Sequence, residues 1–303
     1  MTTMRAEPLS PIDAATLWPQ LGRLSTEVVA TRSGENLLLS SGLAATGLTR
    51  LPRVARTVVV GVRRALSYRG VLVAGELDGG TAWECVSLRI ARTIDDETVT
   101  ALVGAAAVEA ARRGARSLFL RYPESSPHAT GVQRAGMVTY REEHLYALPR
   151  ASQLADSPTF RPAQKRDRAG VFRLYCRAVP QHVRSVEAST LQEWRAVLGS
   201  FECDKELVAE GERGIIGWAG FGDRECRLMI DSVEGLADVA LDLIESMAPR
   251  HGTLVLGNDQ GSLQHRAMER GYAPLGVRLV CTRRLARPIS LKEVAPLPAE
   301  SLA

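Results

Sequence analysis

Lysine is almost missing from this chain. Of its 38 basic residues only Lys165, Lys205 and Lys292 are lysines, which leaves 38 − 3 = 35 arginines against 34 acidic residues. The arginines are spread along the chain and alternate with acids, whereas a nucleic-acid-binding protein gathers its basic residues on one face. The formal net charge of +4 therefore gives no reason to expect a nucleic-acid partner.

Cysteine and long apolar runs are also scarce. The five cysteines are odd in number and widely spaced, no C-x-x-C occurs, and no Cys/His spacing suits zinc, so we expect reduced thiols and no metal site. No apolar run approaches the roughly 18 residues of a membrane span. The first residues lack the basic-then-apolar pattern of a secretion signal. We therefore expect a cytoplasmic protein that does not contact the membrane.

The chain does contain a repeat. In each half a strand-like segment (117–122 and 253–256) leads into a helix closed by a glycine, Gly136 or Gly271, and then into a strand-rich segment. A repeated unit of this length indicates two copies of one domain rather than a solenoid. A chain of 303 residues has room for about two domains.

Local patterns predict the other elements. We expect a helix near 13–24, strands at 57–62, 70–77 and 81–91, and a helix that begins at Asp95 or Asp96. The segment 149–161 has the composition of a linker. The second half begins again at 160, with a hairpin at 211–214, a strand at 226–231 and a strongly amphipathic helix from Leu236 to Met247.

Each half thus predicts a helix, antiparallel strands, a central strand, a helix, a strand, a short helix and two more strands. This order, the Gly136-Met137 and Gly271-Tyr272 steps, and the segment FRPAQKRDRAGVFRLY at 160–175 resemble the GNAT superfamily of acyl-CoA-dependent N-acyltransferases. The resemblance implies an α+β (mixed α/β) fold with two tandem GNAT-like domains, each a mostly antiparallel sheet flanked by helices. These would span 1–150, with degenerate motifs, and 160–287, with a tail at 288–303.

In this family a loop of the form Q/R-x-x-G-x-G/A holds the pyrophosphate of CoA, because glycines let the backbone approach and helix amides face the anion. In the second half Gly235 and Ala237 match this loop, while Ser232 replaces Gln or Arg and Glu234 adds an anion. The resemblance implies that acetyl-CoA, or another acyl-CoA, binds through five residues: Ser232, Val233, Gly235, Leu236 and Ala237.

The first half departs further from the family pattern. Its junction at 92–98 has no glycine, and Asp95, Asp96 and Glu97 crowd the start of the helix. Acids at this position cap a helix well, but they oppose a bound pyrophosphate. We therefore expect the first half to bind CoA weakly or not at all.

The resemblance also directs attention to catalytic groups. The tyrosine that commonly donates a proton in this family is replaced by Val132 and Ala267, which cannot donate one. The family's general base is often a carboxylate on the central strands, and Glu84 and Asp231 are the candidates. Their alternative roles are a solvent-facing strand residue for Glu84 and a helix cap for Asp231. Glu142, Glu143 and His144 lie on the late strands, near where the family places its acceptor substrates, but we expect them on a solvated face.

These expectations lead to one main hypothesis and one alternative. The main hypothesis is transfer of an acyl group, with acetyl expected, from a CoA thioester to a small-molecule amine or a peptide amine. The alternative is a non-catalytic, degenerate GNAT-fold protein that binds a ligand or a partner, since a fold alone does not decide function. The sequence gives no indication of the oligomeric state.

Overall fold

A single 13-stranded sheet runs through the protein. The computed structural model describes residues 5–10, 13, 16–24, 26–30, 57–64, 67–77, 80–91, 95–149, 159–188, 190–198, 201, 203–212, 214–231, 235–248 and 252–285. The expected linker lies largely outside these residues, as does the expected tail. Among them no helix is long and apolar enough to cross a membrane.

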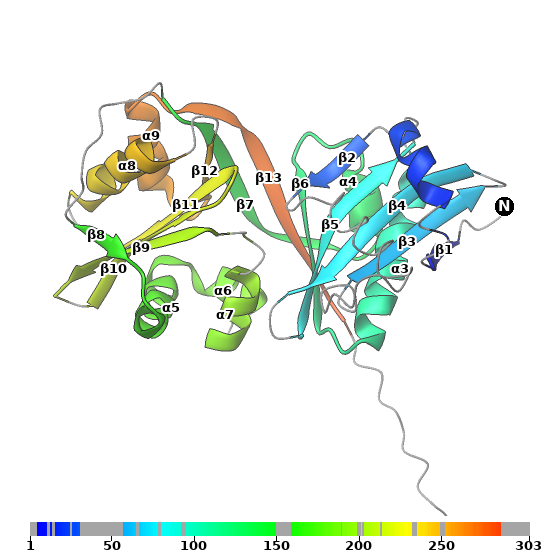
Figure 1. The fold of residues 1–303 in the computed structure, drawn as a ribbon, viewed down its shortest axis with the longest axis horizontal. Helices are drawn as coiled ribbons and strands as arrows, with labels where there is room; N and C mark the ends of the chain where they lie inside the picture. Colours follow the sequence, from blue (N-terminus) through cyan, green and yellow to red (C-terminus); the bar gives the residue numbers. More distant parts are fainter. Residues whose placement is uncertain are drawn as a thin grey trace, which may run out of the picture.

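The described residues of the first half form strands β1 to β7, the 3-10 helix η1 and the helices α3 and α4 (Figure 1). In chain order these elements are β1 (Ala6–Pro8), the 3-10 helix η1 (Trp18–Arg23), β2 (Thr26–Ala30), β3 (Thr57–Arg64), β4 (Ser67–Glu76), β5 (Ala82–Ile90), α3 (Asp96–Arg112), β6 (Ser117–Pro123), α4 (Ala129–Arg134) and β7 (Val138–Ala147).

The second half opens with three helices before its main strands. Its elements are β8 (Phe160–Pro162), the 3-10 helix η3 (Lys165–Asp167), α5 (Arg168–Ala178), α6 (Gln181–Glu187), α7 (Leu191–Leu198), β9 (Lys205–Gly211), β10 (Gly214–Phe221), β11 (Glu225–Ile230), α8 (Leu236–Met247), β12 (Thr253–Gly257), α9 (Gly261–Glu269) and β13 (Ala273–Arg284).

The two halves repeat one order of elements. Each has three antiparallel strands, a helix, a strand parallel to the third, a short helix and a long final strand. The predicted mixed α/β fold is therefore confirmed. One detail was wrong: each half ends in one long strand rather than two. Of the helix expected near 13–24, the described residues Asp13, Thr16 and Leu17 are α-helical, and the chain continues as the 3-10 helix η1.

The final strands are exchanged between the halves. The strand order β6-β13-β7-β12 places β13 against β6 of the first half and β7 against β12 of the second half. β7 and β13 also pair with each other and lie side by side between the two lobes in Figure 1. Each half thus completes the sheet of the other.

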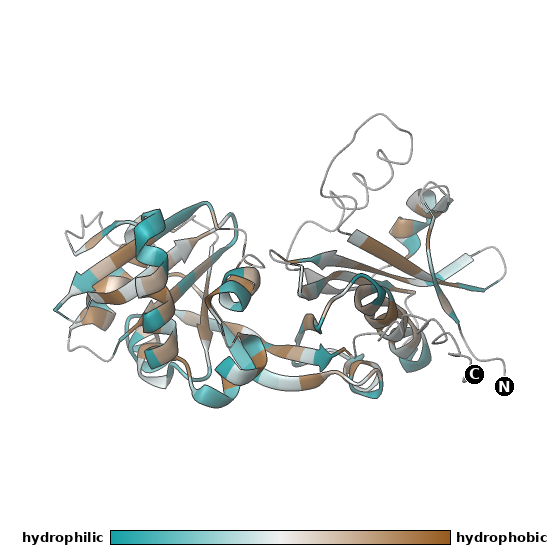
Figure 2. Cartoon of the chain, turned by 90° about the horizontal axis from the view of Figure 1, so that it is seen from below, coloured by the Kyte–Doolittle hydropathy of each residue, from teal (hydrophilic) through white to brown (hydrophobic). Residues whose placement is uncertain are grey.

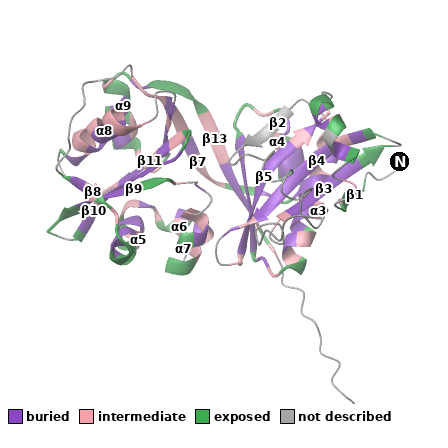
Figure 3. Cartoon of the chain, in the orientation of Figure 1, coloured by how far each residue is buried: buried purple, intermediate pink, exposed green. Residues whose placement is uncertain are grey.

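Amphipathic helices cover the sheet. In α3 the predicted apolar positions Val99, Leu102 and Val103 have no exposed surface, and the backbone of β4 comes so close that a Cβ on Gly70 would lie 2.9 Å from Leu102. The central parts of the strands are apolar in Figure 2 and buried in Figure 3, while the helix faces turned away from the sheet are exposed. Burying one leucine contributes about 1.5–3 kcal/mol, so these faces fix the helices to the sheet.

Candidate functional site

The two parallel strands of each half pair only where they begin. In the first half the last β5–β6 partners are Cys85 and Leu120, although β5 continues to Ile90. In the second half the last β11–β12 partners are Arg227 and Val255, although β11 continues to Ile230. The strands then diverge, and the backbone groups facing the gap must find other partners.

A glutamine side chain spans the gap in the second half. The Gln260 Nε2 donates to the carbonyl of Leu228 on β11 at 2.9 Å, and its Oε1 accepts from the amide of Gly257 on β12 at 2.9 Å. Gln264 Nε2 donates to the Gly257 carbonyl at 2.7 Å. The gap therefore has the width and polarity to hold one carboxamide group between the strands.

The helices that follow the central strands begin differently in the two halves. α8 begins after Gly235, which has a left-handed φ of +77° and makes no side-chain cap, and a Cβ there would meet no atom within 4 Å. α3 begins after Asp95, whose carboxylate accepts from the Thr98 amide at 3.1 Å and from its hydroxyl at 2.7 Å. A side-chain cap thus occupies an amide donor at the α3 start, whereas the residue before α8, Gly235, has no side chain with which to cap it.

The start of α3 is also covered by α4. A Cβ on Gly131 of α4 would lie 2.8 Å from Val99 Cβ and 2.9 Å from the carbonyl oxygen of Asp96. Such close approach is possible only for glycine. Combined with the Asp95 cap, it leaves little room for an anion at this helix end.

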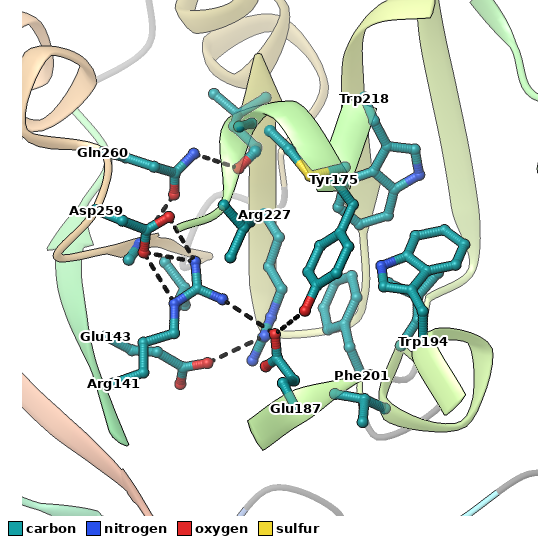
Figure 4. Close-up of a pocket in the computed structure, with 18 of the residues that line it drawn as sticks. Arg141, Glu143, Tyr175, Glu187, Trp194, Phe201, Trp218, Arg227, Asp259 and Gln260 are labelled. Carbon is teal, nitrogen blue, oxygen red and sulfur yellow. Dashed lines mark hydrogen bonds and ion pairs between the residues drawn. The ribbon is translucent and has the colours of Figure 1, made fainter. Parts of the chain in front are cut away.

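The gap of the second half opens into a cavity of about 90 Å³ between the halves. One wall is aromatic and the other is charged, as Figure 4 shows. The aromatic wall consists of Tyr175, Trp194, Phe201 and Trp218. The charged wall includes Arg141, Glu143, Glu187, Arg227 and Asp259, and Gln260 adjoins it.

Glu143 of β7 is the centre of a buried ion network. Its carboxylate lies 2.8 Å from Arg278 Nε, 3.2 Å from Arg227 Nη1 and 3.5 Å from Arg121 Nε. Burial would raise the pKa of Glu143, but the surrounding arginines together hold it well below its usual range. Glu143 is therefore ionised at neutral pH and holds three cations from both halves.

Two further carboxylates complete this network. Glu225 accepts from Arg278 Nη1 at 2.7 Å and lies 3.3 Å from Arg227 Nη2, while Glu84 pairs with Arg121. Three carboxylates thus face three arginines. In the β7–β13 ladder Glu143 lies directly opposite Arg278, and both stand seven residues after the glycine that closes the preceding helix. The two halves are therefore related by a pseudo-twofold axis at this pair, with opposite charges at equivalent positions.

Glu187, in the last turn of α6, is held differently. Its carboxylate accepts from the Tyr175 hydroxyl at 2.9 Å and from the Tyr140 hydroxyl at 3.4 Å. Arg141 Nη1 lies 3.7 Å away, because this arginine makes its closer contacts with Asp259, at 3.0 Å from Nε. Burial and the neighbouring Glu187 carboxylate raise the pKa of Tyr175, so its hydroxyl stays protonated.

The catalytic residues proposed from sequence lie elsewhere. Glu84 has no exposed surface and is paired with Arg121, so the alternative of a solvent-facing residue was wrong. Asp231 follows β11 and accepts from Arg177 Nε at 2.9 Å. Neither residue lines the cavity. Val132 and Ala267, at the family's proton-donor position, are both fully buried.

The predicted pyrophosphate loop is described only in part. Gly235, Leu236 and Ala237 form the start of α8, and the Leu236 side chain packs into the core. Ser232 and Val233 lie outside the described residues. Among the residues that are described, no group of three His, Cys, Asp or Glu side chains could hold a metal ion.

Apart from Glu143, the cavity residues named above were not recognised as site residues from the sequence. Glu187 lies in α6, Arg141 in β7 and Asp259 in the turn between β12 and α9, and no spacing along the chain connects them. The aromatic residues Tyr175 and Trp194 were recognised only as apolar positions of helices. No motif could have identified this site, because the fold alone brings its parts together.

Comparison with known proteins identifies the fold. No protein-family model matches the sequence, and no curated protein matches it. Among solved structures, a tandem GNAT protein from the clavulanic acid biosynthesis pathway is 15% identical, with a TM-score of 0.50 over 93% of this chain and 98% of that one. A GCN5-related N-acetyltransferase from Sphaerobacter thermophilus is 13% identical, with a TM-score of 0.52 over 94% and 96% of the two chains.

A third structure, a putative acetyltransferase from Pyrococcus horikoshii, is 11% identical and has a TM-score of 0.51 over 95% of this chain and 91% of that one. A structural likeness at such low sequence identity shows the fold alone, so activity must be argued from the site. The matches span nearly the full length of both chains, so the likeness includes the duplication. This chain therefore has the tandem fold of the GNAT superfamily.

Proposed function

We propose that this protein is an acyl-CoA-dependent N-acyltransferase whose second half binds the acyl-CoA, with acetyl as the expected acyl group. One observation carries the proposal. The gap between β11 and β12 borders the start of α8, which follows Gly235, at one end and opens into a cavity with a carboxylate at the other. A long thioester and an amine could therefore meet in this gap.

The described residues fit the arm and the phosphates of CoA. Gln260 places a carboxamide between Leu228 and Gly257, and the pantetheine arm of CoA carries the same amide groups. The backbone amides at the start of α8, at Leu236 and Ala237, could face the pyrophosphate, since a helix amino terminus favours anions. Gln260 must then leave the gap when an acyl-CoA enters it.

Acyl-CoA, when bound, supplies an acyl group activated as a thioester. In the transfer the amine nitrogen forms a bond to the acyl carbon, the bond from that carbon to sulfur breaks, and the ammonium proton must pass to a base. Of the carboxylates that line the cavity, Glu143 and Asp259 are held by arginines at 3.0 Å or less. Glu187 is hydrogen-bonded only by tyrosine hydroxyls, and we propose it as the proton acceptor.

The two carboxylates chosen from sequence receive other roles in this proposal. Asp231 lies between the end of β11 and the start of α8, where with Arg177 it would border the entering thioester. Glu84 holds Arg121, which in turn contacts Glu143. Its role would then be to support the network beneath the cavity.

We further propose that the two expected domains, 1–150 and 160–287, are units of descent with different roles. The first half supplies Tyr140, Arg141 and Glu143 to the cavity through β7. Its own helix start is capped by Asp95, so it would not bind CoA. The five free cysteines fit a cytoplasmic setting.

The alternative is a protein that binds a ligand without catalysis. It is favoured by Gln260 closing the gap and by the apolar residues at positions 132 and 267. The two readings separate when the intact protein is mixed with acetyl-CoA and a panel of primary amines, and the release of free CoA thiol is followed. Amine-dependent thiol release supports catalysis. Binding of acetyl-CoA without any thiol release supports the alternative, and absence of acetyl-CoA binding contradicts the acyltransferase.

A further inference from the structure

We infer that the acceptor is a compact primary amine with an apolar body, held as an ammonium ion by Glu187 and the aromatic wall of the cavity. This inference rests on the proposed function and names its substrate class. It concerns binding, which is measurable without acyl transfer. Three features of the cavity carry it: charge, aromatic content and size.

The buried cluster has one negative charge in excess. Among the described residues, ion pairs of 3.7 Å or less join five carboxylates to four arginines: Glu84, Glu143, Glu187, Glu225 and Asp259 with Arg121, Arg141, Arg227 and Arg278. The formal sum is 4 − 5 = −1. A buried charge without a counter-ion is costly, so a cation that enters this site is favoured.

Glu187 is the carboxylate where this excess is concentrated. Its nearest arginine nitrogen, on Arg141, is 3.7 Å away and bonds closely to Asp259 instead. Tyr140 and Tyr175 hydroxyls hold its two oxygens from β7 and α5, one from each half. Glu187 is thus fixed in position yet without an arginine hydrogen bond, which suits an ammonium group.

The opposite wall suits the rest of such a ligand. Aromatic residues make up 5% of the chain, yet four of them line this cavity, including Trp194 and Trp218, two of the four tryptophans. Aromatic faces attract ammonium groups and bury apolar carbon. One ring already makes a cation–π contact within the protein, because the Arg227 guanidinium lies 5.0 Å from the centre of the Phe201 ring.

Size restricts the acceptor. The cavity of about 90 Å³ is smaller than a cavity of about 150 Å³ that accepts benzene. Trp194, Leu198 and Phe201 also line a second groove, so these three side chains separate the cavity from it. A polypeptide amine would have to displace this wall, whereas a small amine would not.

The test is binding of small amines to the intact protein, by calorimetry, with and without saturating CoA. The probes are isobutylamine and propylamine, each compared with its neutral alcohol, and a tripeptide with a free amino terminus. We expect the amines to bind at least ~10-fold more tightly than the alcohols or the tripeptide. Equal affinity for amine and alcohol in both conditions would overturn the inference.

Variants identify the residue responsible. Glu187→Gln keeps the hydrogen-bonding shape and should weaken amine binding ~10-fold or more while leaving alcohol binding unchanged. The control is Glu212→Gln, at an exposed acid of the same half, which should change neither. If Glu187→Gln does not fold, Tyr175→Phe removes the hydroxyl that holds the carboxylate and should weaken amine binding ~2- to 5-fold. Unchanged amine affinity in the folded variant contradicts the inference.

Failure of the amine site and failure of the proposed function give different results. If the protein binds amines in a Glu187-dependent way but does not bind acetyl-CoA, the amine site stands and the acyltransferase proposal is rejected. If acetyl-CoA binds and thiol release with amines is unaffected by Glu187→Gln, the acyltransferase proposal stands and the amine site at Glu187 is rejected.

Discussion

Replacing Glu143 with glutamine tests whether the buried network holds the halves together. The substitution keeps the shape of the side chain but removes the charge that three arginines share. The inner network of three carboxylates and three arginines would then carry one uncompensated positive charge. Breaking a buried ion pair by removing one partner costs about 3–5 kcal/mol. Because the glutamine oxygen still accepts one hydrogen bond, we expect about 3 kcal/mol.

The assay is urea unfolding of the intact chain at neutral pH, followed by circular dichroism. The matched control is Glu269→Gln, which breaks an exposed pair with Arg266 at 2.9 Å and should cost less than about 1 kcal/mol. If Glu143→Gln costs no more than this control, the network contributes no net stability and the reasoning is wrong.

The pH dependence gives the same test a second readout. Although burial opposes it, the arginines lower the pKa of Glu143 well below its usual range, so the folded state binds a proton there less readily than the unfolded state. The stabilising contribution is present above the unfolded pKa of about 4.3 and is lost as pH falls toward the folded pKa. The stability difference between wild type and Glu143→Gln should therefore narrow as pH falls below about 4.5. A constant difference down to the acid limit would contradict this assignment.

Two further substitutions separate the halves and the gap. Gln260→Ala leaves the Leu228 carbonyl and the Gly257 amide without this hydrogen-bond partner, so the free energy of unfolding should fall by about 1 kcal/mol, measured by thermal unfolding. Acetyl-CoA affinity should rise ~3- to 10-fold, because no side chain then fills the gap. Unchanged affinity would mean that acetyl-CoA does not bind in the gap. Asp95→Ala removes the cap of α3 and should cost about 1 kcal/mol of stability with no change in acetyl-CoA affinity, and a change in affinity would place a CoA site in the first half.

The sequence predicts most of the fold because the fold follows local patterns. The strand at 57–62, the helix opening at Asp95 or Asp96 and the amphipathic helix from Leu236 to Met247 all appear where periodicity and capping predict them. The glycines Gly136 and Gly271 both have left-handed φ angles, which explains why they close equivalent helices.

The exchange of β7 and β13 is not written in any local pattern. An apolar strand predicts that it pairs, but its partner depends on which edge the rest of the fold leaves open. For the same reason Glu143 and His144 were expected on a solvated face, whereas Glu143 is only 3% exposed. Once the exchange is known, arginines from four strands and carboxylates from both halves converge. The site therefore depends on tertiary pairing rather than on a motif.

The most direct test of the central claim is acetyl-CoA binding by the intact protein and by Ala237→Glu. Ala237 holds the second position of α8, where α3 has Glu97. An acid at this position stabilises a helix but repels a pyrophosphate. With one or two charge contacts, each on the order of 1 kcal/mol in a solvated site, affinity should fall about 5- to 30-fold.

Calorimetry at low salt measures affinity and thermal unfolding measures stability, with Ala237→Gln as the control for size. The account predicts one acetyl-CoA site in the wild type and nearly the same affinity in Ala237→Gln. Ala237→Glu should bind acetyl-CoA more weakly at low salt, and this difference should shrink as salt screens the repulsion between the carboxylate and the phosphates. The melting temperature of Ala237→Glu should not fall. Absence of acetyl-CoA binding to the wild type, or equal affinity in Ala237→Glu and Ala237→Gln at low salt, would contradict it.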